Sequence, residues 1–205
     1  MTAINALGES AAGTTASAVP EVPPNAPSQL SATASTTNAS VSLQWTASPG
    51  ASSYVVKRAL SASSPWVVIA NDVSSTSFTD VDATSGRTYY YSVAAETSAG
   101  QESANSPAAT ATIIPAAPTN LTATTSKSQA MLSWTSSLGA TSYKVLRSTT
   151  SGGSYSLVAS GVTTTNFTDS RVTTGTTYHY VVQAVDATGT SADSSQVSVT
   201  PKRGK

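Results

Sequence analysis

The chain repeats itself once, at a constant spacing of 89 residues. The matching pairs are Trp45 and Trp134, Tyr54 and Tyr143, Arg58 and Arg147, Phe78 and Phe167, Asp80 and Asp169, Gly86 and Gly175, Tyr89 and Tyr178, and Gly100 and Gly189. A single offset through the whole set indicates two copies of one domain, over 27–114 and 118–201. Two copies of this length are too few for a solenoid, whose repeats are shorter and more numerous.

Each copy carries the hydrophobic pattern of a β-protein. Val41, Leu43 and Trp45 share one face of an expected strand, and polar side chains share the other. Similar runs recur between turn-forming residues, and no window keeps the 3.6-residue period of a helix. We therefore expect an all-β chain of two tandem seven-stranded immunoglobulin-like sandwiches. The strands expected in the first copy are 29–35, 40–46, 54–60, 66–70, 76–79, 88–97 and 104–113, and those after the first recur 89 residues later.

The longest expected strand, 88–97, separates core from surface by its alternation. Tyr89, Tyr91 and Val93 fall on its inward face, whereas Tyr90 and Ser92 fall on its outward face. We expect the first three side chains in the core and the last two on the outside of the sandwich.

Charge and composition exclude several classes of function. Ten Lys and Arg balance ten Asp and Glu, and only 10% of the residues are charged, against about 25% in an ordinary domain. Without a basic excess we expect no nucleic-acid binding. No apolar run approaches the roughly 20 residues of a membrane-spanning helix, so we expect no membrane insertion. A chain without cysteine has no disulfide, no thiol nucleophile and no cysteine zinc site.

Four kinds of residue in each copy resemble the marks of the fibronectin type III family. These are a proline before the first strand, a tryptophan on the second, a tyrosine on the third, and a tyrosine after a glycine turn on the sixth. Here they are Pro27 and Pro118, Trp45 and Trp134, Tyr54 and Tyr143, and Tyr89 and Tyr178. The chain is similar to the domains attached to secreted bacterial polysaccharide hydrolases and to surface or phage structural proteins. It departs from the family at Ala83 and Val172, where leucine is usual.

The resemblance implies structural roles for six aromatic residues. Each tryptophan is expected to fill the space between the two sheets, where a buried ring removes much apolar surface from water. Tyr89 and Tyr178 are expected to bond a backbone carbonyl upstream and so to pin the loop between the sheets. The expected core residues are Trp45, Tyr54, Tyr89, Trp134, Tyr143 and Tyr178.

The join between the copies is short. Residues 115–117 form the expected linker, and Pro115 and Pro118 stand at its two ends. Because proline restricts the backbone, we expect a semi-rigid rod with the domains end to end.

Catalysis has little support in the sequence. The single histidine, His179, falls on the outer face of its strand, and no G-x-S-x-G nucleophile elbow occurs. A triad needs a histidine beside a nucleophile and an orienting acid, and one histidine cannot form a histidine metal cluster. We therefore expect no enzyme activity, no catalytic or metal site and no cofactor.

The repeated aspartate has several interpretations. We expect Asp80 and Asp169 to cap turns through Asx-type hydrogen bonds. Weak calcium binding by Asp72, Asp80 and Asp82 is an alternative. An acid pair of the kind found in glycosidases is disfavoured, because nothing in the sequence would raise the pKa of one carboxyl by burial.

Three further aromatic residues are candidates for contact with a partner or a sugar. Trp66 follows Pro65 near a sheet edge, Tyr155 takes the same place in the second copy, and Tyr90 faces outward. The structural interpretation is half-buried packing over the rim of the sandwich. The functional interpretation is a flat platform for a pyranose ring or a protein interface.

Both ends of the chain have the composition of linkers. Residues 1–26 are small, polar and proline-rich, and 202–205 form a short basic tail. The first 26 residues are interpreted either as an unstructured tail or as an arm that orders against a partner or a neighbouring copy. They lack the basic and apolar regions of a signal peptide, so we expect no signal peptide in this chain.

The sequence thus favours a non-catalytic module that spaces, displays or docks other parts. Such a module would act outside a cell, on a cell surface or on a virion surface. It could be a fragment of a secreted bacterial protein or a self-contained decoration protein, with protein partners or neighbouring copies bound through residues 1–26. The alternative is a carbohydrate-binding accessory module with polysaccharide as partner. The sequons at Asn38, Asn120 and Asn166 matter only if the source glycosylates its proteins.

Overall fold

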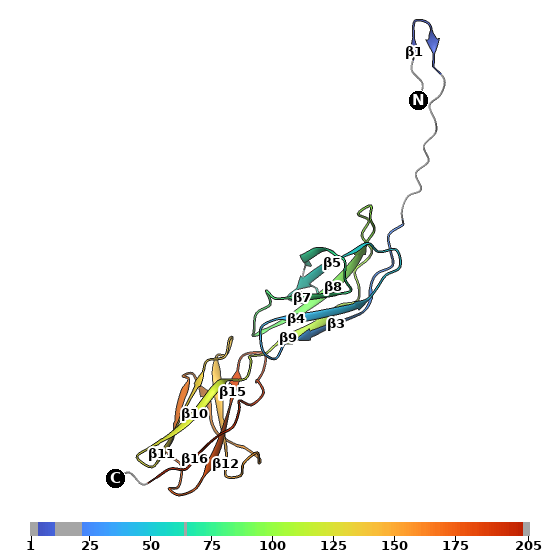
Figure 1. Ribbon diagram of the computed structural model, residues 1–205. Coiled ribbons are helices and arrows are strands. Elements are labelled where there is room, and N and C mark those ends of the chain that lie inside the picture. The colour runs from blue at the N-terminus through green and yellow to red at the C-terminus, as the bar shows by residue number, and fades with distance from the viewer. Residues whose placement is uncertain (1–3, 11–21, 64, 203–205) are drawn as a thin grey trace.

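The computed structural model describes residues 4–10, 22–63 and 65–202. All regular structure in these residues is β-strand. Figure 1 shows a small hairpin at the N-terminal end and two β-sandwiches that lie end to end. The chain is therefore all-β, as the alternating pattern predicts.

The first sandwich packs a three-stranded sheet, β3-β4-β7, against a four-stranded sheet, β6-β5-β8-β9. Every pair of hydrogen-bonded neighbours in both sheets is antiparallel. The strands are β3 (Ser28–Ala34), β4 (Val41–Thr46), β5 (Ser53–Ala59), β6 (Val67–Val73), β7 (Ser77–Asp80), β8 (Arg87–Glu96) and β9 (Ala109–Ile113).

The second sandwich repeats this topology, with sheets β10-β11-β14 and β13-β12-β15-β16. Its strands are β10 (Thr119–Ser126), β11 (Gln129–Thr135), β12 (Ser142–Ser148), β13 (Ser156–Val162), β14 (Asn166–Asp169), β15 (Tyr178–Val185) and β16 (Val197–Val199). The linker lies between β9 and β10, and Pro115 and Pro118 are both buried.

The core of each sandwich forms where the alternation predicts it. Along β4, Val41, Leu43 and Trp45 are buried and the residues between them are exposed. The Trp45 ring meets the Tyr54 ring edge to face, with centroids 5.3 Å apart. In the second copy the rings of Trp134 and Tyr143 are also 5.3 Å apart. The aromatic pair therefore joins the two sheets in the same way in both copies.

Tyr89 and Tyr178 each bond the loop that precedes their strand, an arrangement called the tyrosine corner, but the prediction of the bonded group was wrong. The amide N–H of Thr84 donates to the Tyr89 hydroxyl at 3.2 Å. The amide N–H of Thr173 donates to the Tyr178 hydroxyl at 3.0 Å. The tyrosine oxygen thus accepts a hydrogen bond from a backbone amide and does not donate one to a carbonyl, because the turn points an N–H at the hydroxyl group.

The last strand of the first copy is shorter than the predicted 104–113, because serine side chains replace its first ladder bonds. Ser103 Oγ accepts from the Ala95 N–H at 2.9 Å, and Ser106 Oγ accepts from the Val93 N–H at 3.0 Å. Ser92 was predicted on the outward face, and its burial there was not foreseen. This segment covers Ser92, whose hydroxyl donates to the Ser106 carbonyl.

The second copy uses the same device before β16. Ser191 Oγ accepts from the Ala184 N–H and Ser194 Oγ accepts from the Val182 N–H. The strand expected over 193–202 is accordingly limited to Val197–Val199. We call these four side chains the serine ladder: Ser103, Ser106, Ser191 and Ser194.

The edge strand β6 is longer than the predicted 66–70. It continues to Val73 through register shifts against β5, and Asp72 has a φ of 53°. The added residues lie on the free edge of the sheet, where bulges occur most often. The same extension occurs in β13.

The N-terminal hairpin was not predicted. Strands β1 (Ile4–Asn5) and β2 (Gly8–Glu9) pair antiparallel across a two-residue turn. Leu7 in the turn is 97% exposed and Ile4 is 77% exposed. The expected arm over 1–26 includes 1–3 and 11–21, and the expected tail includes 203–205, all of which lie outside the described residues.

Candidate functional sites

A buried aspartate joins the two sheets of the first copy. Asp80, 3% exposed, accepts hydrogen bonds through Oδ2 from the Arg58 guanidinium at 2.8 Å and from the Tyr91 hydroxyl at 2.9 Å. Its Oδ1 accepts from the amide of Asp82 at 3.1 Å. The predicted Asx turn is therefore present. The bonds to Arg58 and Tyr91 were not foreseen.

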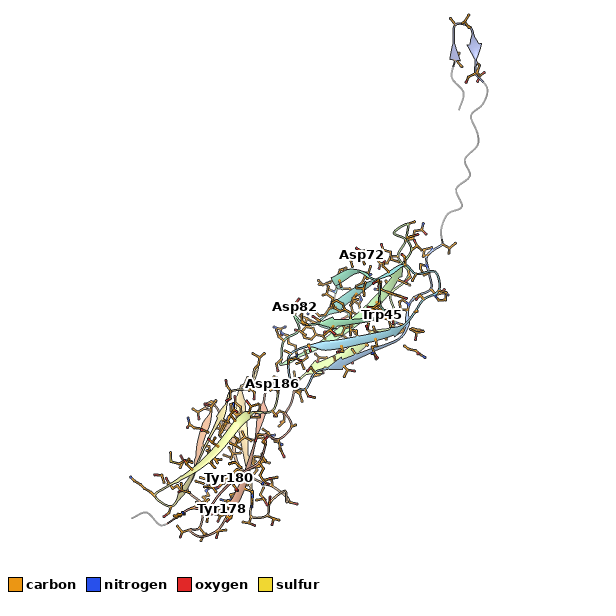
Figure 2. The ribbon with its side chains drawn as sticks, viewed as in Figure 1. Trp45, Asp72, Asp82, Tyr178, Tyr180 and Asp186 are labelled. Carbon is orange, nitrogen blue, oxygen red and sulfur yellow. The ribbon has the colours of Figure 1, made fainter. Side chains whose placement is uncertain are left out.

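The second copy holds the equivalent cluster. Asp169 accepts from Arg147 at 2.7 Å, from Tyr180 at 2.9 Å and from the amide of Arg171 at 2.9 Å. Arg147 also stacks over the Tyr178 ring, 4.8 Å from its centroid. Figure 2 shows Tyr178 and Tyr180 within the second sandwich. The cluster thus links the tyrosine corner to both sheets.

These contacts shift the pKa of the buried tyrosine and of the arginine in each cluster. Burial, followed by the hydrogen bond to the aspartate, raises the pKa of Tyr91 and Tyr180 well above the ordinary tyrosine value. Burial alone would lower the pKa of Arg58, but the bond to Asp80 and its charge outweigh burial and raise it. Both shifts keep the arginine charged and the tyrosine neutral, which suits a structural cluster.

The calcium alternative finds no support in the geometry. Asp80 is occupied by Arg58 and Tyr91, and Asp72 lies on the free edge of β6 (Figure 2). Among the described residues, no three His, Asp or Glu side chains gather so as to hold a metal ion.

No helix in the described part of the chain could span a membrane.

The aromatic candidates of the first copy share one row on the outer face of the four-stranded sheet. Ala59 lies opposite Tyr90, and continuing the β5–β6 register by one residue places Trp66 on the other side of Ala59. Trp66 and Tyr90 are both half-buried, and Ala59 between them is only 4% exposed. The structure therefore brings Trp66 and Tyr90 to one face of one sheet.

Tyr155 stands at the equivalent place in the second copy but is held differently. Its hydroxyl donates to the Gln196 side-chain oxygen at 2.6 Å. Ser148 replaces Ala59 in this row, and His179 replaces Tyr90. His179 is on the outer face, as predicted, and is half-buried. The second row is thus more polar than the first.

A groove lies beside the third strand at the same place in both copies. In the first copy it has a volume of about 520 Å³ and includes Leu60, Pro65 and Val67, with Arg58 and Arg87 in its wall. In the second it has a volume of about 290 Å³, with Thr149, Ser154 and Ser156 at the equivalent apolar positions. One position of the fold therefore carries an apolar groove in one copy and a hydroxyl-lined groove in the other.

The two sandwiches touch through the turn that follows β15. Asp186 accepts a hydrogen bond from the Ser85 hydroxyl of the first sandwich at 3.1 Å. The Thr188 hydroxyl is shared between the Asp186 carboxylate at 2.6 Å and the Ile113 carbonyl of the first sandwich at 3.0 Å. Figure 2 shows Asp186 at the end of the second sandwich nearest the first. We call these contacts the domain junction.

Hydrogen bonds to Asp186 and two closely packed glycines stabilise the domain junction. Burial by itself would raise the pKa of Asp186, but hydrogen bonds from Thr188, Gly189 and Ser85 outweigh burial and hold that pKa below its usual range. A Cβ at Gly189 would lie 2.9 Å from a side-chain carbon of Ile114, and one at Gly139 would lie 2.3 Å from the Ser85 Cβ. The two domains therefore approach more closely than larger side chains would allow.

Comparison with known proteins explains the repeated landmarks. Residues 30–114 match the family described as "Fibronectin type III domain SaeA third domain". The chain belongs to the fibronectin type III family. A two-domain fibronectin type III segment of chicken tenascin has the same fold, with a TM-score of 0.64 at 22% identity, and the match covers 85% of this chain and 98% of that one.

Bacterial enzymes contain segments similar to these fibronectin type III domains. An amylopullulanase of Thermoanaerobacterium saccharolyticum is 43% identical over 81 residues, which is 40% of this chain and 6% of that protein. Chitinase A1 of Niallia circulans is 34% identical over 204 residues, which is 91% of this chain and 27% of that protein. The chain thus spans only a small part of the enzymes that it matches.

Neither the Arg58–Asp80 pair nor the domain junction was predicted from the sequence of these fibronectin type III domains, although the pair left a signal there. Arg58 and Asp80 were visible as repeated positions, and a buried aspartate that recurs with a repeated arginine is a signal for an ion pair. The junction was not foreseen beyond its prolines. Asp186 has Thr97 as its counterpart in the first copy, so the repeat itself gave no reason to select it.

Proposed function

We propose that the chain is a non-catalytic spacer that holds other parts of an extracellular bacterial protein or surface assembly at a set distance and angle. The domain junction carries this proposal. It combines a hydrogen bond from Ser85 to Asp186 with the close approach of Gly189 to Ile114. Two buried prolines bound the linker, so little free backbone remains between the domains.

The similar bacterial proteins support this role. Those named above are enzymes, and this chain matches only segments of them. Inter-domain interfaces within a chain are by default mobile, unless specific contacts fix them. A joint with directed hydrogen bonds and fitted glycines is the feature that a spacer needs.

A distance measurement between spin labels tests the spacer. The chain has no cysteine, so Ser42→Cys and Met131→Cys give one label in each domain, at equivalent exposed positions. We expect a single narrow distance distribution. Asp186→Thr, which inserts the residue of the first copy, should broaden it. Asp193→Thr removes an acid of the same domain away from the junction and should leave it unchanged. A wild-type distribution as broad as that of Asp186→Thr would refute a fixed spacer.

A second candidate function is carbohydrate binding, and the row of Trp66 and Tyr90 favours it. Flat rings on an outer sheet face, on either side of a small residue, suit stacking against sugar rings. We expect Trp66→Ala and Tyr90→Ala to reduce retention of the chain on insoluble chitin or starch, with unchanged melting temperature. Tyr155→Ala, in the more polar row, serves as the comparison. A wild-type chain that is not retained on either polymer would remove this candidate.

A further inference from the structure

The groove of the first sandwich has an apolar floor that is open to solvent. Leu60 is 56% exposed and Val67 is 61% exposed, and both line the groove with Pro65. The second copy has Thr149, Ser156 and Ser154 at these positions. Because the fold tolerates hydroxyl groups there, folding does not require the apolar side chains of the first copy. An exposed apolar patch of this kind commonly marks an interaction site.

The wall of the same groove is positively charged. The Arg58 guanidinium is held by Asp80 and lies over the Tyr89 ring, 5.0 Å from its centroid. Arg87 is exposed at the start of β8, and within the described residues it forms no ion pair. Thr176 stands at its place in the second copy. The groove of the first copy therefore combines apolar contact with a cationic group at Arg87, whereas the second groove carries its second arginine at a different position, Arg171.

The N-terminal hairpin is complementary to this groove in polarity and in charge. It presents Leu7 and Ile4, which are 97% and 77% exposed, and it carries the acidic Glu9. Residues 1–26 carry two acidic side chains, Glu9 and Glu21, and no Lys or Arg, so their side chains have a net negative charge. An isolated two-stranded hairpin is at best marginally stable in water, so a hairpin of two-residue strands gains from a surface to pack on. Figure 1 shows β1 and β2 apart from both sandwiches of their own chain.

We propose that the β1–β2 hairpin of one chain docks in the first-domain groove of a second copy. Leu7 enters between Leu60 and Val67, and Glu9 pairs with Arg87. Because the hairpin and the groove are different surfaces, the contact is head to tail and builds chains or rings rather than a closed dimer. This inference rests on the proposal that the module belongs to an assembly, and it names the surfaces that join the copies.

Sedimentation of the whole chain tests the docking. From about 10 µM to about 1 mM the wild type should show concentration-dependent association. Leu7→Asp and Arg87→Glu should each weaken the association constant on the order of tenfold. The charge swap, Glu9→Arg with Arg87→Glu in one chain, should restore most of it. Arg171→Glu makes the same charge change in the lining of the second-copy groove, so it is the matched control and should have no effect.

Several results would overturn the docking. A wild-type chain that stays monomeric over the whole range excludes it, as does association that Arg87→Glu leaves intact. Failure of the charge swap to restore association excludes the Glu9–Arg87 pairing. The variants lie outside both cores, and unchanged melting temperatures verify this. If the wild type does not associate but its spin-label distance distribution is narrow, only the docking inference is rejected. A broad distance distribution in the wild type would reject the spacer.

Discussion

The two domains share their buried contacts and differ in the groove on their surface. The same Trp–Tyr pair, Arg–Asp–Tyr cluster and serine ladder recur in both copies with nearly equal distances. The grooves beside the third strand, in contrast, differ in volume and in chemistry. Residues with many buried neighbours are thus alike in the two copies, whereas solvent-facing residues of the groove differ.

The largest expected effect comes from removing the buried aspartate. Asp80→Ala leaves the Arg58 charge and the Tyr91 hydroxyl unpaired, which should cost the first domain about 3–5 kcal/mol. Asp169→Ala should cost less, because Arg147 also donates to the Arg171 carbonyl at 2.7 Å and keeps that partner. Hydrogen exchange, read separately for each domain, measures both losses.

The exposed Asp82→Ala is the control for the aspartate variants and should change stability little. Equal losses of stability for Asp80→Ala and Asp169→Ala would show that the hydrogen bond from Arg147 to the Arg171 carbonyl does not compensate for the missing aspartate.

The serine ladder should show a smaller asymmetry. Ser106→Ala and Ser194→Ala each leave a buried amide without its acceptor, which costs about 1–3 kcal/mol. Ser106→Ala should be the more harmful, since Ser92 also lies 3.4 Å from the Ser106 hydroxyl, whereas the counterpart of Ser92 is Val181. Denaturant unfolding with the exposed Ser195→Ala as control measures the difference. If Ser106→Ala proves harmless, the serine ladder is not a substitute for strand pairing.

The junction should loosen in acid, because Asp186 must be ionised to accept its hydrogen bonds fully. The pKa of Asp186 is lowered in the folded chain, so its contribution is complete above the ordinary aspartate pKa of about 3.9 and is lost as pH falls through the lower, folded pKa. We expect the spin-label distance distribution to broaden below about pH 4 in the wild type. Asp186→Thr should be broad at every pH. A distribution that does not change with pH would mean that Asp186 does not hold the junction.

The smallest effect concerns the hairpin between β10 and β11. Lys127 and Ser128 form its two-residue turn with φ of 48° and 66°, a conformation that favours Asn and Gly. Lys127→Asn with Ser128→Gly should stabilise the second domain by about 1 kcal/mol. Thermal unfolding measures the gain. A loss of stability would show that these two side chains make contacts that outweigh the backbone preference.

Much of the fold followed from local patterns. Alternation predicted the buried face of β4, Trp45 included, because a strand that borders one core must alternate. It did not reveal the burial of Ser92, where a segment from elsewhere in the chain covers the outer face of the sheet. The predicted last strand was also too long. Serine hydroxyl groups take the place of backbone acceptors there, and the sequence pattern does not show this.

The candidate sites were less predictable than the core. Trp66 and Tyr90 were selected as separate aromatic residues, and only the strand register, continued one residue beyond β6, sets them on either side of Ala59. The groove could not be foreseen, because Leu60 and Arg87 come from segments that are distant in sequence and meet only in the folded domain.

The sequence by itself determined the number of domains, their β-class and most of their core, because repetition and alternation are local properties of a chain. The tertiary structure alone decided that Asp80 pairs with Arg58, that Asp186 reaches Ser85, and that one groove is apolar where its twin is polar. These are contacts between segments far apart in sequence. Their distances depend on how sheets and domains pack, which no single stretch of residues encodes.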